Sequence, residues 1–302
     1  MAHSKLSLVA LLLATAAYVH ASDRDTATKT LLDLQRIYAK TSFGDGPSVD
    51  IPCVMGHCLT PSLGCLASSM CRNAMSCSQK CLKMWDNDTT HGKVIIQNCS
   101  NTCSFTYADK AYENFMECVT DSKCIAFPPI PNTCLSPNIH PQKNLSLADM
   151  QGSWWVVKGL HPVYDCYPCQ HLSMAPLNKT IWAYRPNYQV PLVNGSLLLI
   201  KQEMLIPNKS APGGNISFVY HDVGMDHFET WWLLDKANDG SHMIMYYCGN
   251  TLQWYYEGAL VLSKNQTLDK SVYADIATSF QKSVGLDLND FCDVRATSAC
   301  PD

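Results

Sequence analysis

Ten of the 16 cysteines of this chain lie in one segment, residues 51–126, and this density constrains the fold more than any other feature. Such a segment is typical of a disulfide framework in an oxidising compartment. Cys77 and Cys81 are four residues apart, and so are Cys99 and Cys103, so each pair lies on one helix face. Two such helices lying antiparallel can be joined by two bridges. We therefore predict a cysteine-rich disulfide domain that contains a helical hairpin.

The N-terminus has the pattern of a secretory signal peptide over residues 1–21. Lys5 supplies the positive charge, residues 6–19 are apolar or small, and small residues precede a predicted cleavage site. The apolar stretch is short for a membrane span, which needs about 20 residues. Residues 22–50 are polar and are interpreted as a linker or propeptide, in which residues 28–40 have the apolar spacing of one helix.

Eight N-x-S/T sequons point to the same compartment. They predict glycosylated surface asparagines and passage through the endoplasmic reticulum. We therefore expect a protein of the secretory pathway that is extracellular. The sequons lie at Asn87, Asn98, Asn144, Asn178, Asn194, Asn208, Asn215 and Asn265.

Length and charge limit the remaining organisation. A chain of 302 residues suggests two domains. The net charge is −4 and no long basic run is present, which argues against a nucleic-acid partner. No second apolar run is long enough for a transmembrane segment, and no metal-ligand or nucleotide motif is found. Five prolines in residues 127–143 indicate an extended linker between the two domains. For the oligomeric state we expect a monomer or weak dimer.

Residues 144–264 show the period-2 alternation of short strands. Turn signals such as Asn194-Gly195 and Asp239-Gly240 separate them. Seven or eight antiparallel strands in about 120 residues suit an up-and-down barrel. The clearest expected strands are Trp154 to Gly159, Thr180 to Tyr184, Leu197 to Met204, Ile216 to Tyr220, Phe228 to Leu234, Met243 to Cys248 and Trp254 to Leu262.

A helix is predicted after the strands, over residues 268–291. Its apolar residues fall four apart and form one stripe, and Gly285 ends its first part. The stripe consists of Val272, Ile276, Phe280 and Val284.

One short motif indicates which kind of β-barrel the strand region forms. Gly152-Ser153-Trp154 opens it as lipocalins open, and with the cysteine ladder and His161-Pro162-Val163-Tyr164-Asp165 it resembles the violaxanthin de-epoxidase family. The resemblance covers about residues 53–300. It implies a mainly β fold with a small α domain, in which the cysteine-rich helical disulfide domain precedes a lipocalin-type antiparallel β-barrel and C-terminal helix in residues 144–302. It also implies reduction of a xanthophyll epoxide with ascorbate as co-substrate and no metal, and gives the plastid thylakoid lumen as an alternative location.

The family's disulfide bridges imply a pairing for twelve cysteines. Cys134, Cys166, Cys248 and Cys292 have no counterpart, and their three possible pairings stay open. The implied bridges are Cys53 with Cys71, Cys58 with Cys65, Cys77 with Cys103, Cys81 with Cys99, Cys118 with Cys124, and Cys169 with Cys300.

The resemblance also implies site residues. The family's proposed catalytic carboxylate falls at Glu229, and its catalytic tyrosine falls at Tyr247. Gln170 matches a pocket glutamine. Asp165 and His221 match polar positions at the barrel mouth.

The chemistry of epoxide reduction fits an acid at this place. The epoxide oxygen must be protonated, and a carboxyl buried in a barrel has a raised pKa and can donate a proton near mildly acidic pH. Strand alternation places His227, Glu229 and Trp231 on one face. We predict Glu229 as the proton donor, with Tyr247 as its partner. The predicted substrate-binding residues are Gln170, Asp165, His221, His227, Trp154, Trp231 and Trp254.

Departures from the family support other hypotheses. Pro168 and Tyr255 stand where the family has aspartates of its acid-pH response. A secreted lipocalin that binds a carotenoid, sterol or other apolar ligand without turnover is the alternative. A third possibility is an extracellular interaction protein whose barrel is filled by side chains. Cys166-x-x-Cys169 is also compatible with a redox or zinc pair.

Overall fold

The computed structural model describes residues 48–82, 92–126, 139–141, 146–208, 215–222, 225–251, 255–294 and 300. The predicted signal peptide, the predicted helix over residues 28–40 and most of the proline-rich linker lie outside these ranges. Contacts divide the chain into two compact units, Met1–Lys83 with Tyr107–Pro128, and Met84–Thr106 with Pro129–Asp302.

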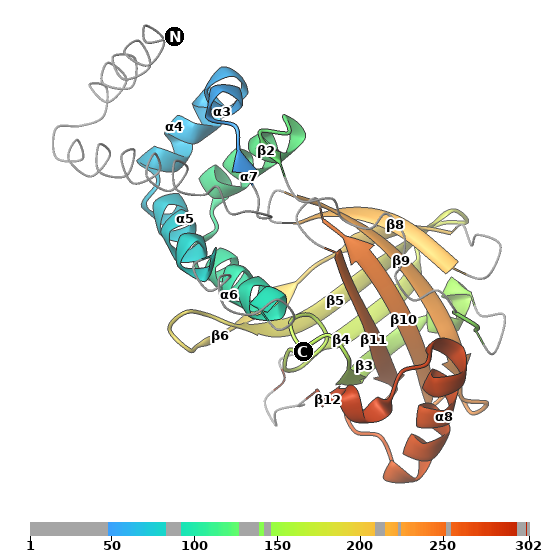
Figure 1. Cartoon of the computed structure of the whole chain (residues 1–302). Coiled ribbons are helices and arrows are strands. Elements are labelled where there is room, and N and C mark those ends of the chain that lie inside the picture. Colours follow the sequence, from blue (N-terminus) through green and yellow to red (C-terminus); the bar gives the residue numbers. More distant parts are fainter. Residues whose placement is uncertain are drawn as a thin grey trace, which may run out of the picture. The chain divides into compact units, whose positions relative to one another are not determined.

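The first unit consists mainly of helices and a small two-stranded ribbon (Figure 1). Aspartates cap two of the helices, because the Asp50 carboxylate accepts the N–H of Cys53 at 3.0 Å and the Asp109 carboxylate accepts the N–H of Tyr112 at 2.9 Å. The elements are β1 (Ser48–Val49), α3 (Ile51–His57), α4 (Leu59–Ala67), α5 (Ser69–Leu82), α7 (Lys110–Asp121) and β2 (Ile125–Ala126). The sequence prediction of a helical cysteine-rich region is confirmed.

The disulfides of this unit correct three of the implied pairings. Cys53 bonds to Cys124, Cys58 to Cys118, and Cys65 to Cys71, with Cα–Cα distances of 5.3, 5.7 and 5.1 Å. The implied nested pairs were wrong because α7 packs against α3 and α4 and brings two distant cysteines beside the first two.

Four further cysteines belong to helices α5 and α6 (Gly92–Tyr107), as their spacing predicted. All four are disulfide-bonded, and their pairing stays a prediction. They are Cys77, Cys81, Cys99 and Cys103. So many disulfides are typical of an oxidising compartment.

The second unit is built around a curled antiparallel sheet with a helix on one face (Figure 1). The strand order is β6-β5-β4-β3-β11-β10-β9-β8, while β7 pairs with β5 and β12 pairs with β3. The strands are β3 (Gly152–Gly159), β4 (His171–Pro176), β5 (Ile181–Pro191), β6 (Leu197–Lys201), β7 (Met204–Pro207), β8 (Asn215–Asp222), β9 (Met225–Lys236), β10 (His242–Asn250), β11 (Tyr255–Ser263) and β12 (Cys292–Asp293). Neighbours in sequence are mostly neighbours in the sheet, as an up-and-down barrel requires. The predicted fold class is confirmed.

Two apolar clusters lie on opposite faces of the sheet. The inner face carries alternate residues of β10 such as Met243, Met245 and Tyr247, and the outer face carries Ile244 and Tyr246 between them. The outer cluster is covered by α8 (Tyr273–Val284), whose stripe includes the buried Ile276 and Phe280. Gly285 ends α8 in a left-handed conformation with φ 72°, as predicted. None of the helices described here is long and apolar enough to span a membrane.

Disulfides fix the segment between β3 and β4. Cys169 bonds to Cys300, as the resemblance implied, and Cys166 bonds to Cys292 on β12. These bridges exclude the redox or zinc pair considered for Cys166 and Cys169. Cys248 is also disulfide-bonded, and Cys134 lies outside the described residues. The segment between β3 and β4 that these two disulfides hold also carries Asp165.

Most predicted glycosylation sites in the described part lie on the surface. Five asparagines are exposed, whereas Asn215 is half-buried and its side-chain oxygen is buried. Asn87 and Asn144 lie outside the described residues, and glycosylation itself stays a prediction. The exposed asparagines are Asn98, Asn178, Asn194, Asn208 and Asn265.

Candidate functional site

Three neighbouring strands place a glutamate, a glycine and a tyrosine in one row of the inner face. Glu229 on β9 is the cross-strand partner of Gly249 on β10, which is the partner of Tyr256 on β11. A Cβ at Gly249 would come within 2.7 Å of the Tyr256 hydroxyl. The missing side chain therefore lets Tyr256 reach across β10 to Glu229.

The carboxyl group of Glu229 accepts three hydrogen bonds. Oε1 accepts from the hydroxyls of Tyr220 at 3.0 Å and Tyr256 at 2.9 Å, and Oε2 accepts from Nε1 of Trp231 at 2.8 Å. Glu229 keeps some accessible surface, yet aromatic groups surround its carboxyl on the inner face. Burial raises the pKa of Glu229, and the three hydrogen bonds oppose this rise only in part. Glu229 is thus a buried acid that can hold a proton above the usual range of a glutamate.

His227 lies beside this carboxyl on the same strand face. Its ring stacks on Tyr220 with centroids 4.5 Å apart, and its Nδ1 lies 3.4 Å from the Tyr256 hydroxyl. Burial lowers the pKa of His227 to about 4, so the imidazole is neutral at pH 5 and above. The predicted common face of His227, Glu229 and Trp231 is confirmed.

A second buried carboxyl lies one row further along the sheet. The Tyr247 hydroxyl donates to Oδ1 of Asp165 at 2.5 Å, and Oδ2 accepts the backbone N–H groups of Leu160 at 3.2 Å and His161 at 2.8 Å. Burial raises the pKa of Asp165 to about 7. Because Oδ2 already faces two N–H donors, the proton of the acid form belongs on Oδ1, next to Tyr247.

Gly258 makes room for this second pair. It is the cross-strand partner of Tyr247, and a Cβ on it would lie 2.5 Å from both the Tyr247 hydroxyl and Oδ2 of Asp165. The prediction that Tyr247 is the partner of Glu229 is therefore corrected. Tyr247 belongs to a different row, and the segment after β3 brings Asp165 to it from 82 residues away in sequence.

The predicted polar residues of the barrel mouth separate into different environments. Asp165 is buried, whereas His221 is exposed on the other side of β8 from Tyr220 and pairs with Asp226 at 3.2 Å. Alternation directs His221 away from the inner face and from both buried carboxyls, and its role in substrate binding stays a prediction. Gln170 donates from Nε2 to the Tyr164 carbonyl at 2.5 Å, and its buried Oε1 has no partner in the described part of the chain.

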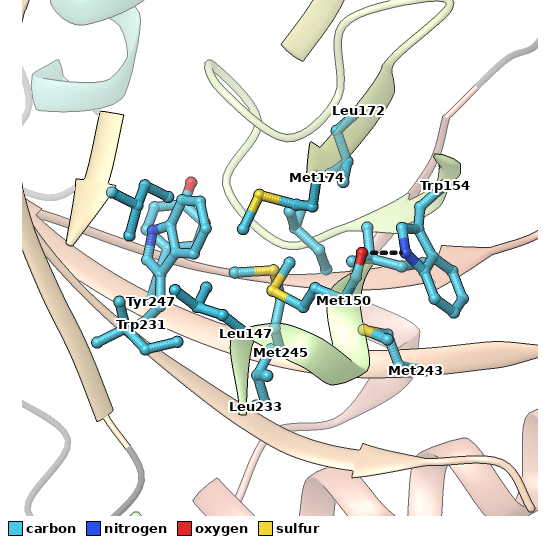
Figure 2. Close-up of a cluster of buried hydrophobic side chains, with 14 of the residues drawn as sticks. Leu147, Met150, Trp154, Leu172, Met174, Trp231, Leu233, Met243, Met245 and Tyr247 are labelled. Carbon is cyan, nitrogen blue, oxygen red and sulfur yellow. Dashed lines mark hydrogen bonds between the residues drawn. The ribbon is translucent and has the colours of Figure 1, made fainter. Parts of the chain in front are cut away.

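The predicted tryptophans do not gather at one place. Trp231 lies beside Glu229, while Trp154 lies at the opposite side of the inner cluster, where its Nε1 donates to the Met150 carbonyl at 2.7 Å (Figure 2). Trp154 therefore does not contact the buried acids. Trp254 lies outside the described residues.

Sequence reasoning missed two tyrosines that bond to Glu229. Tyr220 directly precedes His221, and Tyr256 lies two residues before Gly258. Strand alternation gave a signal for both, because each occupies the inner-face phase of its strand. Their convergence on one carboxyl depends on strand order, which a single sequence does not state.

A curled antiparallel up-and-down sheet with a packed inner face and a C-terminal helix is a lipocalin-type architecture. The family model described as the VDE lipocalin domain matches residues 50–296, and the chain belongs to this family. Violaxanthin de-epoxidase (chloroplastic) of Spinacia oleracea is 24% identical over 267 residues, which are 82% of this chain and 51% of that protein. The enzyme of the same name from Arabidopsis thaliana is 21% identical and covers 82% of this chain. The chain spans about half the length of the curated relatives it matches.

Solved structures of low similarity were also found. Apocrustacyanin C2 is 16% identical, covers 57% of this chain and 96% of its own, and has a TM-score of 0.39. Lobster apocrustacyanin A1 is 14% identical, covers 57% and 96%, and has a TM-score of 0.37. Matches at this level add nothing to the functional argument.

Proposed function

We propose that this protein is a violaxanthin de-epoxidase-like oxidoreductase that reduces an epoxide of a xanthophyll or similar isoprenoid, with ascorbate as the reductant. The balanced reaction takes the epoxide, the ascorbate monoanion and one proton to an alkene, water and dehydroascorbate. Two carbon–oxygen bonds break, ascorbate supplies two electrons, and the oxygen leaves with two protons. The protein must therefore bring protons to an oxygen held in an apolar environment.

The observation that carries the proposal is the buried carboxyl of Glu229. Burial raises its pKa and so extends upward the pH range in which it holds a proton, which favours a role as a general acid. Trp231 can only donate, so its N–H remains on Oε2, whereas the tyrosine hydroxyls on Oε1 can turn and accept. Glu229 can thus hold its proton while all its polar neighbours stay bonded.

The Asp165–Tyr247 pair is proposed as the source of the second proton. Its carboxyl has a pKa of about 7, and the acid form directs its proton toward Tyr247. Water formation needs two protons, and two separate acids on one face meet that need. Tyr247 keeps its predicted role in the reaction, with Asp165 in place of Glu229 as its partner.

The rest of the inner face supports the proposed substrate class. Beyond the two carboxyls this face is lined by Met, Leu, Ile and aromatic side chains, which favour a long apolar molecule. Ascorbate as co-substrate rests on the family alone. We propose the secretory pathway as the location because of the sequons, with the plastid thylakoid lumen as the alternative because the curated relatives are named chloroplastic.

The test is pigment turnover by the oxidised protein. We would incubate it with violaxanthin and ascorbate at about pH 5 and pH 7 and follow the products by chromatography. Glu229→Gln is expected to lower turnover by about 10²–10⁴-fold, because general acid catalysis contributes this much. Glu203→Gln is the matched control, since Glu203 is exposed and paired with Arg185. Product formation that is equal in both variants would remove Glu229 from the reaction.

Binding of an apolar ligand without turnover is the second candidate. It is favoured by Pro168 and Tyr255, which replace aspartates of the family, and Tyr255 bonds to Glu257 at 2.9 Å. Under this hypothesis the same incubation gives bound pigment and no product at either pH.

A further inference from the structure

The hydroxyl group of Tyr256 lies between two titratable groups. It is 2.9 Å from Oε1 of Glu229 and 3.4 Å from Nδ1 of His227. A phenol has one proton to donate and can accept another, so it can take a proton from one neighbour while giving its own to the other. Tyr256 can therefore connect an imidazole to a carboxyl without becoming charged.

The sheet holds these three groups in place. His227 is the cross-strand partner of Tyr220, and the two rings stack at 14° to each other, while the Tyr220 hydroxyl bonds to Glu229. Gly249 leaves the space through which Tyr256 reaches both partners. The imidazole and the carboxyl thus come from β9, and the phenol reaches them from β11 across β10.

Glu229 needs a source of protons if it is used once per turnover. Its hydrogen-bond partners are two tyrosines and a tryptophan, and burial holds the pKa of both tyrosines far above the usual value. None of these groups can give up a proton permanently. The titratable group next to them is His227, which keeps 9% of its surface accessible. No hydrogen bond to its Nε2 is found among the described residues.

Other titratable groups on the packed elements act electrostatically on this cluster, some of them from the outer side of the sheet. Their effects on the pKa values of His227, Tyr220, Tyr256 and Tyr184 are smaller than that of burial. They are His221 and Asp222 on β8, Asp226 on β9, Tyr247 on β10, Tyr184 on β5, and Tyr164 and Asp165 in the segment after β3.

We propose that His227 returns a proton to Glu229 through the hydroxyl of Tyr256 after each turnover. This inference rests on the proposed function of Glu229 as the acid. A buffer acid gives a proton to Nε2 of neutral His227, the Nδ1 proton moves to the Tyr256 oxygen, and the Tyr256 hydroxyl proton moves to Oε1. One proton is transferred in total, no electrons move, and His227 only changes its tautomer, which exchange with solvent restores. His227 and Tyr256 are positioning and relay residues, since Glu229 is the member of this group of three that acts on the substrate.

The neutral state of His227 suits this role. Burial lowers its pKa to about 4, so the ring passes a proton on and does not retain it. The 3.4 Å separation from Tyr256 is long for a hydrogen bond, so the relay requires the two groups to approach each other by a few tenths of an ångström.

The experiment measures kcat and KM of the full oxidised chain with violaxanthin and ascorbate as the imidazole concentration is raised. His227→Phe keeps the ring stacked on Tyr220 and removes the relay. We expect kcat to fall about tenfold or more at low buffer concentration, with KM unchanged, and added imidazole to restore it. Tyr256→Phe is expected to show the same fall. The matched control His171→Phe, which alters a ring whose centroid lies 4.6 Å from that of Trp155 at an interplanar angle of 49°, is expected to keep the wild-type kcat.

A purely structural role of His227 gives a different result. The fall in kcat is then insensitive to imidazole, and this outcome, or a kcat within twofold of wild type at low buffer, overturns the relay. A second measurement does not depend on turnover. The ¹⁵N shift of His227 Nδ1 should change as Glu229 titrates in the wild type and lose this response in Tyr256→Phe. If the wild type reduces no epoxide, the proposed function is wrong, and the relay is then tested by the ¹⁵N measurement alone. If the ¹⁵N shift of His227 in the wild type does not respond to the titration of Glu229, the relay is refuted.

Discussion

The two ends of the inner face of the sheet are built from the same strands but hold different side chains. One end holds the buried carboxyls of Glu229 and Asp165, each bonded to tyrosines. The opposite end holds Trp154 and Met150 together with other methionine and leucine side chains (Figure 2). There the indole N–H of Trp154 donates a hydrogen bond to the Met150 carbonyl. Alternation places side chains inward at both ends, so only residue type separates them.

The comparison teaches where stability and chemistry lie. A carboxyl withdrawn from water disfavours its charged form, so the polar end costs stability above its raised pKa values. The apolar end gains free energy from burial of large side chains. We therefore expect mutations at the apolar end to change unfolding and mutations at the polar end to change protonation and turnover.

The largest expected effect on stability is at the apolar end. Trp154→Ala removes a fully buried indole and should lower the free energy of unfolding by about 3–5 kcal/mol. Denaturant titration measures this value, and Leu198→Ala on the surface is the control with little expected change. Because Trp154 contacts neither carboxyl but belongs to the apolar lining proposed for the substrate, kcat per folded molecule should stay at the wild-type level while KM rises. A large loss of turnover without unfolding would show that the two ends are not separable.

A smaller effect is expected from Asp165 at the polar end, and it depends on pH. Its folded-state pKa of about 7 exceeds the unfolded value of about 3.9, so the folded protein binds the extra proton between these values. The contribution to stability is fully present below the unfolded pKa and is lost as pH rises toward 7, by up to about 1.4 kcal/mol per pH unit.

Asp165→Asn should remove this dependence. Its amide group can donate to the Tyr247 oxygen and accept both backbone N–H groups, as the protonated acid does. Unfolding free energies measured from about pH 4 to pH 7 should fall in the wild type and stay nearly level in the variant. Equal slopes would mean that the carboxyl titrates at its ordinary pKa in the fold.

The smallest expected effect comes from one added methyl group. Gly258→Ala places a Cβ against Tyr247 and Asp165, and we expect a loss of about 1–3 kcal/mol in stability as the pair is displaced. Turnover should fall with it. Gly64→Ala is the matched control, because Gly64 lies in α4 with open space around it, and alanine favours a helix there by about 0.5–1 kcal/mol. A Gly258→Ala protein as stable and active as wild type would contradict the described packing.

Much of the fold could be predicted from the sequence, although several boundaries could not. The residues of α8 and its Gly285 cap follow from an apolar stripe and a glycine, which are local signals. β4 was not predicted, and residues 197–204 form parts of two strands, β6 and β7, where one was predicted. Both differences concern partners along β5, which pairs with all three strands, and pairing is not a local property.

The candidate site was predicted in part. Glu229 was placed on a common face with His227 and Trp231, which alternation alone supports. The pairing of Tyr247 with Asp165, the outward direction of His221 and the remote position of Trp154 were not predicted. Each depends on contacts between segments distant in sequence or on the strand phase relative to its neighbours.

The sequence by itself determined the helical cysteine-rich region, the strand-rich region, and the stripe and cap of the last helix. These follow from spacing, alternation and turn residues, whose physical causes act over a few residues. Only the tertiary structure decided which cysteines join and which hydroxyl meets which carboxyl. The cysteines join because α7 packs against α3 and α4. The hydroxyls reach the carboxyls because Gly249 on β10 and Gly258 on β11 have no side chain in the way. All these contacts form only after segments distant in sequence have packed together.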